Sequence, residues 1–260
     1  MDTYPGRIGF IGGGRVARIL AGRWERAGLR PASLLVHEPG DEAFAKLVEL
    51  SPRATRSTLE DAAAADVVFL ALHPPAIGPA LPAVRGGLKP EATVVSLAPK
   101  VSLAGLATGL GTTRLARMIP NAPSIVGRGY NPVAFGDGVD AATRASLATL
   151  FAPWGPAPEV DEAALEAYAI LTGMGPTYFW FQWQTLRDLA GELGLPTGQA
   201  DEALRHMLEG AVSTLFDGSL TPEHVMDLIP VRPLESVEAD LTAAYRDKLL
   251  ALFAKIRPGG

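Results

Sequence analysis

The sequence predicts an α/β protein in which an N-terminal doubly wound parallel sheet is followed by an all-helical domain. Three observations support this. Short apolar runs alternate with helical patterns, a glycine-rich turn follows the first run, and the pattern becomes almost wholly helical beyond residue 156. Near-continuous apolar strands joined by helices are typical of a parallel sheet covered on both faces. We expect one domain at residues 1–156 and a second at residues 157–260.

The first half alternates strands and helices in the order of a doubly wound sheet. A helix is expected from Gly14, because apolar residues recur there at helical spacing, and Gly28 is placed to end it as a left-handed cap. The expected strands are Arg7–Ile11, Leu34–His37, Ala54–Arg56, Asp66–Leu72, Thr93–Leu97 and Arg114–Ile119.

The second half is expected to be a helical dimerisation domain. Prolines and a glycine between Pro153 and Pro158 indicate a linker, and Asp161 is placed to cap a helix that continues to about Thr172. A further helix near Tyr178 carries aromatic side chains nearly all round. Because such a helix must be buried on several sides, we expect a homodimer through this domain, or a higher oligomer.

Composition argues against several classes of protein. The net charge is −5 and no basic patch is evident, so we expect no nucleic-acid partner. No apolar run reaches the roughly 18 residues of a membrane span, and the first residues do not form a signal peptide, so we expect a cytoplasmic protein. The chain has 0 cysteines and only scattered histidines, and we expect no metal site.

The turn Gly12-Gly13-Gly14-Arg15-Val16-Ala17 matches the pattern G-x-G-x-x-G/A between an expected strand and an expected helix. Gly12 allows the tight turn, Gly14 lets the backbone approach a pyrophosphate, and Ala17 permits close packing of helix on strand. The N–H groups at the start of the helix then face the phosphates. This context predicts a Rossmann dinucleotide site at Gly12, Gly13, Gly14, Arg15 and Val16.

Glu38 stands at the end of the second expected strand, where the adenosine ribose usually lies. A carboxylate at this place accepts hydrogen bonds from the ribose hydroxyls and repels a 2′-phosphate. The residue therefore favours NAD slightly over NADP. The alternative is that Glu38 is a solvated loop residue.

Five segments are informative in their order and spacing: Ile8–Gly14, Leu72-His73-Pro74, Ser96-Leu97-Ala98, Arg117–Pro123 and Thr172–Tyr178. Together they resemble the pyrroline-5-carboxylate reductase family, which reads Val-Lys-Pro, Ser-Ile-Ala, Arg-x-Met-Pro-Asn-Thr-Pro and Ser-Gly-Ser-Gly-Pro-Ala-Tyr at the last four of them. The resemblance implies hydride transfer from a nicotinamide cofactor to the C=N carbon of a cyclic imine or a related small imino or oxo acid. It also implies cofactor contacts at Leu72, His73, Pro74, Ala98 and Asn121.

The substrate region departs from the family pattern. The family's Ser-Pro-Gly-Gly-Thr-Thr loop is replaced by Ile229–Ser236, and Pro99-Lys100 replaces Ala-Gly beside the expected nicotinamide. Lys100 is a candidate for binding a substrate carboxylate, or else a solvated loop lysine. Asn121 is expected both near the nicotinamide and in a turn. Thr172 and Thr177 are candidate donors to a ligand, or caps of the following helix.

Three functions remain open at this point. The first is reduction of pyrroline-5-carboxylate, and the second is reduction of another imino or oxo acid by the same architecture. The third is a non-catalytic regulatory protein in which dinucleotide occupancy controls a partner. The altered substrate loop motivates this third function.

Overall fold

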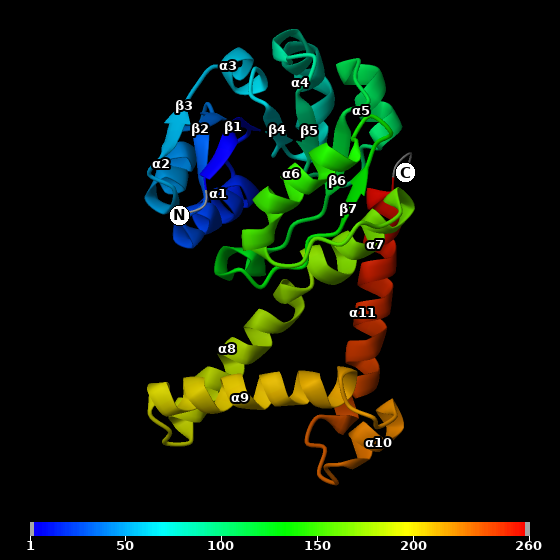
Figure 1. Ribbon diagram of the computed structural model, residues 1–260. Helices are drawn as coiled ribbons and strands as arrows, with labels where there is room; N and C mark the ends of the chain where they lie inside the picture. The colour runs from blue at the N-terminus through cyan, green and yellow to red at the C-terminus, as the bar shows by residue number, and fades with distance from the viewer. Residues whose placement is uncertain (1–2, 258–260) are drawn as a thin grey trace. The chain divides into compact units, whose positions relative to one another are not determined.

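The computed structural model describes residues 3–257 (Figure 1). Its contacts divide the chain into two compact units, Met1–Met174 with Leu252–Gly260, and Gly175–Ala251. The first unit thus continues beyond the proline-rich segment at Pro153–Pro158. None of the described helices combines the length and the apolar character that crossing a bilayer requires.

The first unit is built on one seven-stranded sheet in the order β3-β2-β1-β4-β5-β6-β7. The strands are β1 (Thr3–Ile11), β2 (Arg30–His37), β3 (Ala54–Arg56), β4 (Val67–Leu70), β5 (Thr93–Ser96), β6 (Leu115–Met118) and β7 (Val133–Phe135). All neighbours are parallel except β7, which runs antiparallel to β6. The expected doubly wound fold is confirmed, with the strand order reversing between β1 and β4, the place where such sheets bind ligands.

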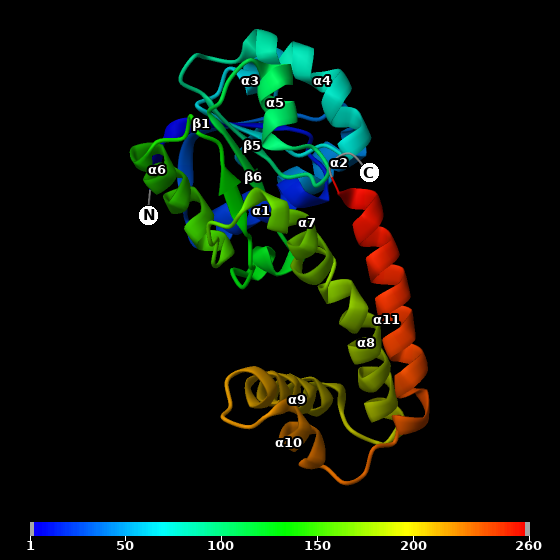
Figure 2. The same cartoon turned by 90° about the vertical axis from the view of Figure 1, so that its right-hand side faces the viewer.

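Helices cover both faces of this sheet, and each face has its own hydrophobic core (Figures 1 and 2). Residues of α1, α2 and α6 pack on one face, and residues of α3, α4 and α5 on the other. The bounds are α1 (Arg15–Ala27), α2 (Asp41–Leu50), α3 (Leu59–Ala63), α4 (Pro74–Gly87), α5 (Leu103–Leu110) and α6 (Ala141–Phe151). As expected, α1 ends at Gly28 with φ +74°.

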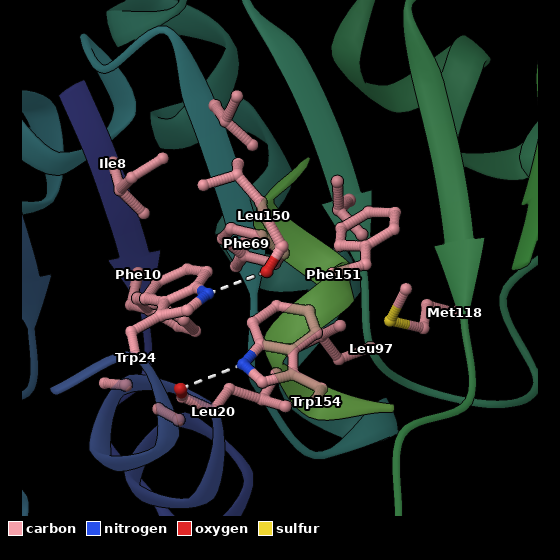
Figure 3. Close-up of a cluster of buried hydrophobic side chains, with 14 of the residues drawn as sticks. Ile8, Phe10, Leu20, Trp24, Phe69, Leu97, Met118, Leu150, Phe151 and Trp154 are labelled. Atoms are coloured by element: carbon pink, nitrogen blue, oxygen red, sulfur yellow. Dashed lines mark hydrogen bonds between the residues drawn. The ribbon is translucent and has the colours of Figure 1, made fainter. Parts of the chain in front are cut away.

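An aromatic cluster joins α1 to the segment after α6 (Figure 3). The Trp24 and Trp154 rings stack with centroids 4.9 Å apart. Trp24 Nε1 donates to the Leu150 carbonyl at 2.7 Å, and Trp154 Nε1 donates to the Leu20 carbonyl at 3.0 Å. Burying a tryptophan stabilises the fold strongly once its N–H has a partner. Trp154 therefore fixes the short 3₁₀ helix Ala152–Trp154 (η2) to the core, although the sequence around it is typical of a linker.

The segment that the sequence predicts as one helix from Asp161 to Thr172 changes type along its length. A 3₁₀ turn (η3, Glu162–Ala164) leads into one α-helical turn (α7, Leu165–Tyr168) and then a π-helical turn (η4, Ala169–Gly173). Single π turns inside helices are frequent at functional sites.

The described residues of the second unit are organised as helices, as expected for this half of the chain. Thr221 caps α10 by accepting from the His224 N–H at 3.4 Å. The helices are α8 (Pro176–Glu192), α9 (Thr197–Phe216), α10 (Pro222–Asp227) and α11 (Glu235–Ile256), the last turn of which belongs to the first unit.

Candidate functional site

The glycine turn connects β1 to α1 with the conformation that its motif predicts. Gly12 has φ +100°, and a Cβ there would lie 2.6 Å from the Ala71 carbonyl oxygen. At Gly14, the N-cap of α1, a Cβ would meet no atom within 4 Å. A side chain at Gly12 would therefore clash with the protein backbone, whereas the space next to Gly14 is free of protein atoms. The N–H groups of Arg15, Val16 and Ala17 form the first turn of α1, where a helix has no partners of its own for them.

Glu38 follows β2 and is fixed against the glycine turn. One carboxylate oxygen accepts from the Gly13 N–H and the other from the Gly40 N–H, both at 2.8 Å. The Gly12 N–H donates to the His37 carbonyl, also at 2.8 Å. The carboxylate is therefore held in one orientation beside the turn and is not a freely solvated loop group.

A groove of about 710 Å³ lies beside Glu38 and is lined by His37, Glu38, Pro39 and residues 56–61. Arg56 is its only lining lysine or arginine. The Arg56 guanidinium pairs with the Asp41 carboxylate at 2.6 Å and lies 4.5 Å from the centroid of the Phe44 ring. The guanidinium of Arg56, the one lysine or arginine side chain that lines the groove, is thus already in an ion pair.

The other expected cofactor residues follow the carboxyl ends of β4, β5 and β6. His73 is the N-cap of α4 and Pro74 its first residue, which places Leu72 and His73 directly after β4. Ala98 is buried two residues beyond β5. Because parallel strands end at the same edge of a sheet, these residues and the glycine turn lie along one edge.

Asn121 follows β6 and forms three hydrogen bonds. Its Nδ2 donates to the Thr172 carbonyl at 3.3 Å, its Oδ1 accepts from the Tyr130 N–H at 3.2 Å, and its own N–H donates to Asn131 Oδ1 at 3.3 Å. The Thr172 hydroxyl donates to the Tyr168 carbonyl at 2.9 Å. Asn121 thus joins the loop after β6 to η4.

Thr177 lies elsewhere in the chain, in the first turn of α8 in the second unit. The segment Ile229–Ser236, which replaces the family's glycine loop, connects α10 to α11 in the same unit. Its Arg232 pairs with Glu235 at 3.4 Å and with Glu238. The Arg232 charge is therefore balanced by the first turn of α11.

Lys100 follows β5 with φ +80°, and it is the only non-glycine residue in the described chain with a positive φ. Its N–H donates to Glu166 Oε1 at 3.2 Å, and its exposed ammonium donates to the Lys255 carbonyl at 3.4 Å. A left-handed residue with a Cβ costs about 1–3 kcal/mol and persists only where its surroundings hold it.

A buried ion cluster that sequence reasoning did not identify lies next to Lys100. Arg117 of β6 is completely buried and donates to Glu162 at 2.8 Å and to Glu166 at 2.5 Å. Glu162 also accepts from the Leu103 N–H at 2.6 Å. The available signal was an arginine inside an apolar strand, together with two glutamates four residues apart. Within residues 3–257, no group of histidine, aspartate and glutamate side chains is arranged to hold a metal ion.

Comparison with known proteins gives a consistent result. A family model described as NADP oxidoreductase, coenzyme F420-dependent, matches residues 7–100. Pyrroline-5-carboxylate reductase of Pseudomonas aeruginosa is 32% identical over 83% of this chain and 80% of its own. The Escherichia coli protein of the same name is 26% identical over 86% and 84%.

Solved structures share the fold at lower identity. Plasmodium falciparum pyrroline carboxylate reductase, solved with NADP bound, has a TM-score of 0.84 at 19% identity, with 98% of each chain covered. The Streptococcus pyogenes 1-pyrroline-5-carboxylate reductase has a TM-score of 0.78 at 21% identity, with 98% of this chain and 99% of that chain covered. Taken with the sequence identity over most of its length, these likenesses show that the chain belongs to the pyrroline-5-carboxylate reductase family and is an NAD(P)-dependent oxidoreductase.

Proposed function

We propose that this enzyme transfers hydride from NADH to the C=N carbon of pyrroline-5-carboxylate or a closely related imino acid. The observation that carries the proposal is the open face of Gly14 at the start of α1, at the point where the strand order reverses. Two relatives over most of the chain, both named pyrroline-5-carboxylate reductase, support reduction of this imine. The altered segment Ile229–Ser236 favours a second candidate, another imino or oxo acid as substrate.

The cofactor fits the residues along this edge of the sheet. Gly12, Gly13, Gly14, Arg15 and Val16 would hold the pyrophosphate, because their backbone can approach it and the start of α1 favours negative charge. Glu38 would bind the adenosine ribose. The residues that would line the nicotinamide side are Leu72, His73, Pro74, Ala98 and Asn121. When bound, the reduced nicotinamide supplies the hydride.

The orientation of Glu38 supports a preference for NADH. Both carboxylate oxygens are fixed by backbone N–H groups, so the charge cannot turn away from a 2′-phosphate. The neighbouring Arg56, which could neutralise such a phosphate, is paired with Asp41. The free 2′- and 3′-hydroxyls of the NADH ribose would instead donate hydrogen bonds to the Glu38 carboxylate.

Replacing Glu38 with serine is expected to raise the ratio of kcat/KM for NADPH to that for NADH by about tenfold or more, which corresponds to roughly 1.4 kcal/mol of removed repulsion. The measurement is a steady-state comparison of both cofactors at a fixed imine concentration. Glu42→Ser, which removes an exposed carboxylate of α2, is the control and should leave the ratio unchanged. An unchanged ratio in Glu38→Ser would contradict the ribose assignment.

The substrate is proposed to be oriented by Lys100, Asn121 and Thr172 of the first unit, and Thr177 of α8 is kept as a separate candidate donor. An imino acid carries a carboxylate, and the Lys100 ammonium is an exposed cation at the ligand-binding edge. One long hydrogen bond to Lys255 leaves further Lys100 N–H donors for a carboxylate. Asn121 would position the loop after β6 through its bonds to Thr172 and Tyr130.

The enzyme is further proposed to act as a homodimer through residues 157–260, of which Gly175–Ala251 forms the second compact unit. In α8 the large side chains of Phe179, Trp180 and Phe181 are 44%, 47% and 65% exposed. An exposed apolar patch of this kind marks an interface. With 0 cysteines the chain suits the reducing cytoplasm, where we place it.

Phe181→Glu is expected to dissociate the dimer. Sedimentation equilibrium should give twice 27.3 kDa for the wild type and 27.3 kDa for this variant, since a charge in the centre of an apolar interface is left without a partner. Ala83→Glu, on the exposed face of α4, is the control and should stay dimeric. A monomeric wild type would refute the dimer.

The proposed reaction is tested by steady-state oxidation of NADH and NADPH with pyrroline-5-carboxylate and a panel of other imino and oxo acids. Turnover of pyrroline-5-carboxylate supports the first candidate, and turnover of another acid alone supports the second. Absence of turnover with the whole panel would contradict both.

A further inference from the structure

The loop after β5 has an unfavourable backbone at the position that would meet substrate. Lys100 has a left-handed conformation with φ +80°, which L side chains avoid, and it follows Pro99, which has no N–H to anchor the loop. Non-glycine residues keep such a conformation where contacts enforce it, and these positions cluster at active sites. A contact in the surrounding structure must therefore hold Lys100 in its left-handed conformation.

Glu166 supplies that contact. Its side chain is 2% exposed, and the same carboxylate oxygen accepts from the Lys100 N–H at 3.2 Å and from the Arg117 guanidinium at 2.5 Å. Arg117 lies next to Ser96 of β5 in the parallel register, so its side chain is on the same face of the sheet as that of Ser96. The carboxylate of Glu166 thus ties the loop after β5 to the interior of β6.

Glu162 holds the other end of the same loop. It accepts from the Leu103 N–H at 2.6 Å and from Arg117 at 2.8 Å. Two carboxylates one helical turn apart therefore bind the first and last residues of Lys100–Leu103, and one buried arginine sets their spacing. A cluster of apolar side chains could stabilise the core as well as these charges do, but it would leave the two loop N–H groups without acceptors.

We propose that Glu166, paired with Arg117, is a positioning residue for Lys100: it fixes the left-handed backbone and so directs the ammonium toward the carboxylate of the imino acid. This inference rests on the proposed function, in which Lys100 binds that carboxylate. Glu166 itself is 2% exposed, so it is not placed to contact a ligand directly. It acts through the Lys100 N–H.

The test is a double-mutant cycle on KM for the imino acid, using Glu166→Ala, Lys100→Ala and the double variant. Glu166→Ala removes the acceptor of the Lys100 N–H and is expected to raise KM on the order of tenfold, while the Kd for NADH stays within about twofold. In the Lys100→Ala background the same change should alter KM by less than about twofold, because the two residues act as a unit. Glu159→Gln, which breaks the Arg144–Glu159 pair, is the matched control and should leave KM unchanged. An equal factor in both backgrounds would make Glu166 merely structural and overturn the proposal.

Two measurements judge the positioning step independently of turnover. Amide exchange at Lys100 should accelerate in Glu166→Ala by a larger factor than the exchange of the β5 amides, which reports the loss of global stability. Lys100→Gly should also melt roughly 2–4 °C above Lys100→Ala, since both lack the ammonium and only glycine tolerates the positive φ. Equal exchange in wild type and Glu166→Ala, or equal Tm values for the two Lys100 variants, would overturn the inference. Absence of turnover with every acid, together with the expected exchange and Tm, would instead refute the imino-acid function.

Discussion

Valine at Gly14 is expected to weaken NADH binding by about 100-fold or more, roughly 2.7 kcal/mol, while the protein folds as stably as the wild type. The side chain would project into the space in front of α1 that the pyrophosphate needs, and a Cβ at this place meets no protein atom within 4 Å. Gly14 has φ −69°, which any residue adopts, so the backbone gains no strain. Calorimetry for binding and thermal melting for stability measure the two effects separately.

Two comparison variants sharpen this prediction. Gly86→Val places the same side chain in open space at the end of α4 and should leave NADH binding unchanged. Gly12→Val should lose both binding and stability, because its φ is +100° and its Cβ would approach the Ala71 carbonyl within 2.6 Å. Wild-type affinity in Gly14→Val would show that the cofactor does not approach this turn.

Arg117→Met is expected to lower the free energy of unfolding by about 3–5 kcal/mol, because it leaves the buried carboxylate of Glu166 without a counter-charge. Arg117 is completely buried and Glu166 is 2% exposed, so water cannot replace the lost partner. Urea denaturation measures the change. Glu159→Gln, in an exposed ion pair, should cost less than about 1 kcal/mol.

Removing the charges together separates the cost of an unpaired carboxylate from the cost of lost packing. Arg117→Met combined with Glu166→Leu should recover part of the stability, because no buried charge then faces an apolar partner. Recovery should be incomplete, since the Lys100 N–H loses its acceptor. A single variant Arg117→Met as stable as Glu159→Gln would show that the cluster is open to solvent.

Local patterns in the sequence were sufficient for the frame of the first unit. Strand positions follow from short apolar runs, and the ends of α1 follow from Gly14 and Gly28, because the conformational needs of a turn or cap are met within a few residues. The glycine turn and the position of Glu38 directly after β2 belong to this group, whereas the bonds that fix Glu38 to the turn became visible only in the structure. Both depend on consecutive segments of one β-α-β unit.

What the sequence did not reveal depends on contacts between distant residues. Trp154 lies in a proline-rich segment but is drawn into the core by stacking on Trp24, and β7 pairs antiparallel with β6 across a loop. The cluster of Arg117 with Glu162 and Glu166 joins residues that are 45 and 49 positions apart. No helical or strand periodicity records such pairs, so the positive φ of Lys100 had no visible cause until the fold placed Glu166 beside it.

The central proposal for this protein is that hydride passes from a nicotinamide to an imine carbon. The direct measurement is mass spectrometry of the product after incubation with pyrroline-5-carboxylate and NADH deuterated at the transferring position of the ring. Transfer of hydride from the cofactor predicts deuterium on the former C=N carbon of the product. NADH that stays reduced, with no labelled product from either epimer of the cofactor or from deuterated NADPH, would contradict it.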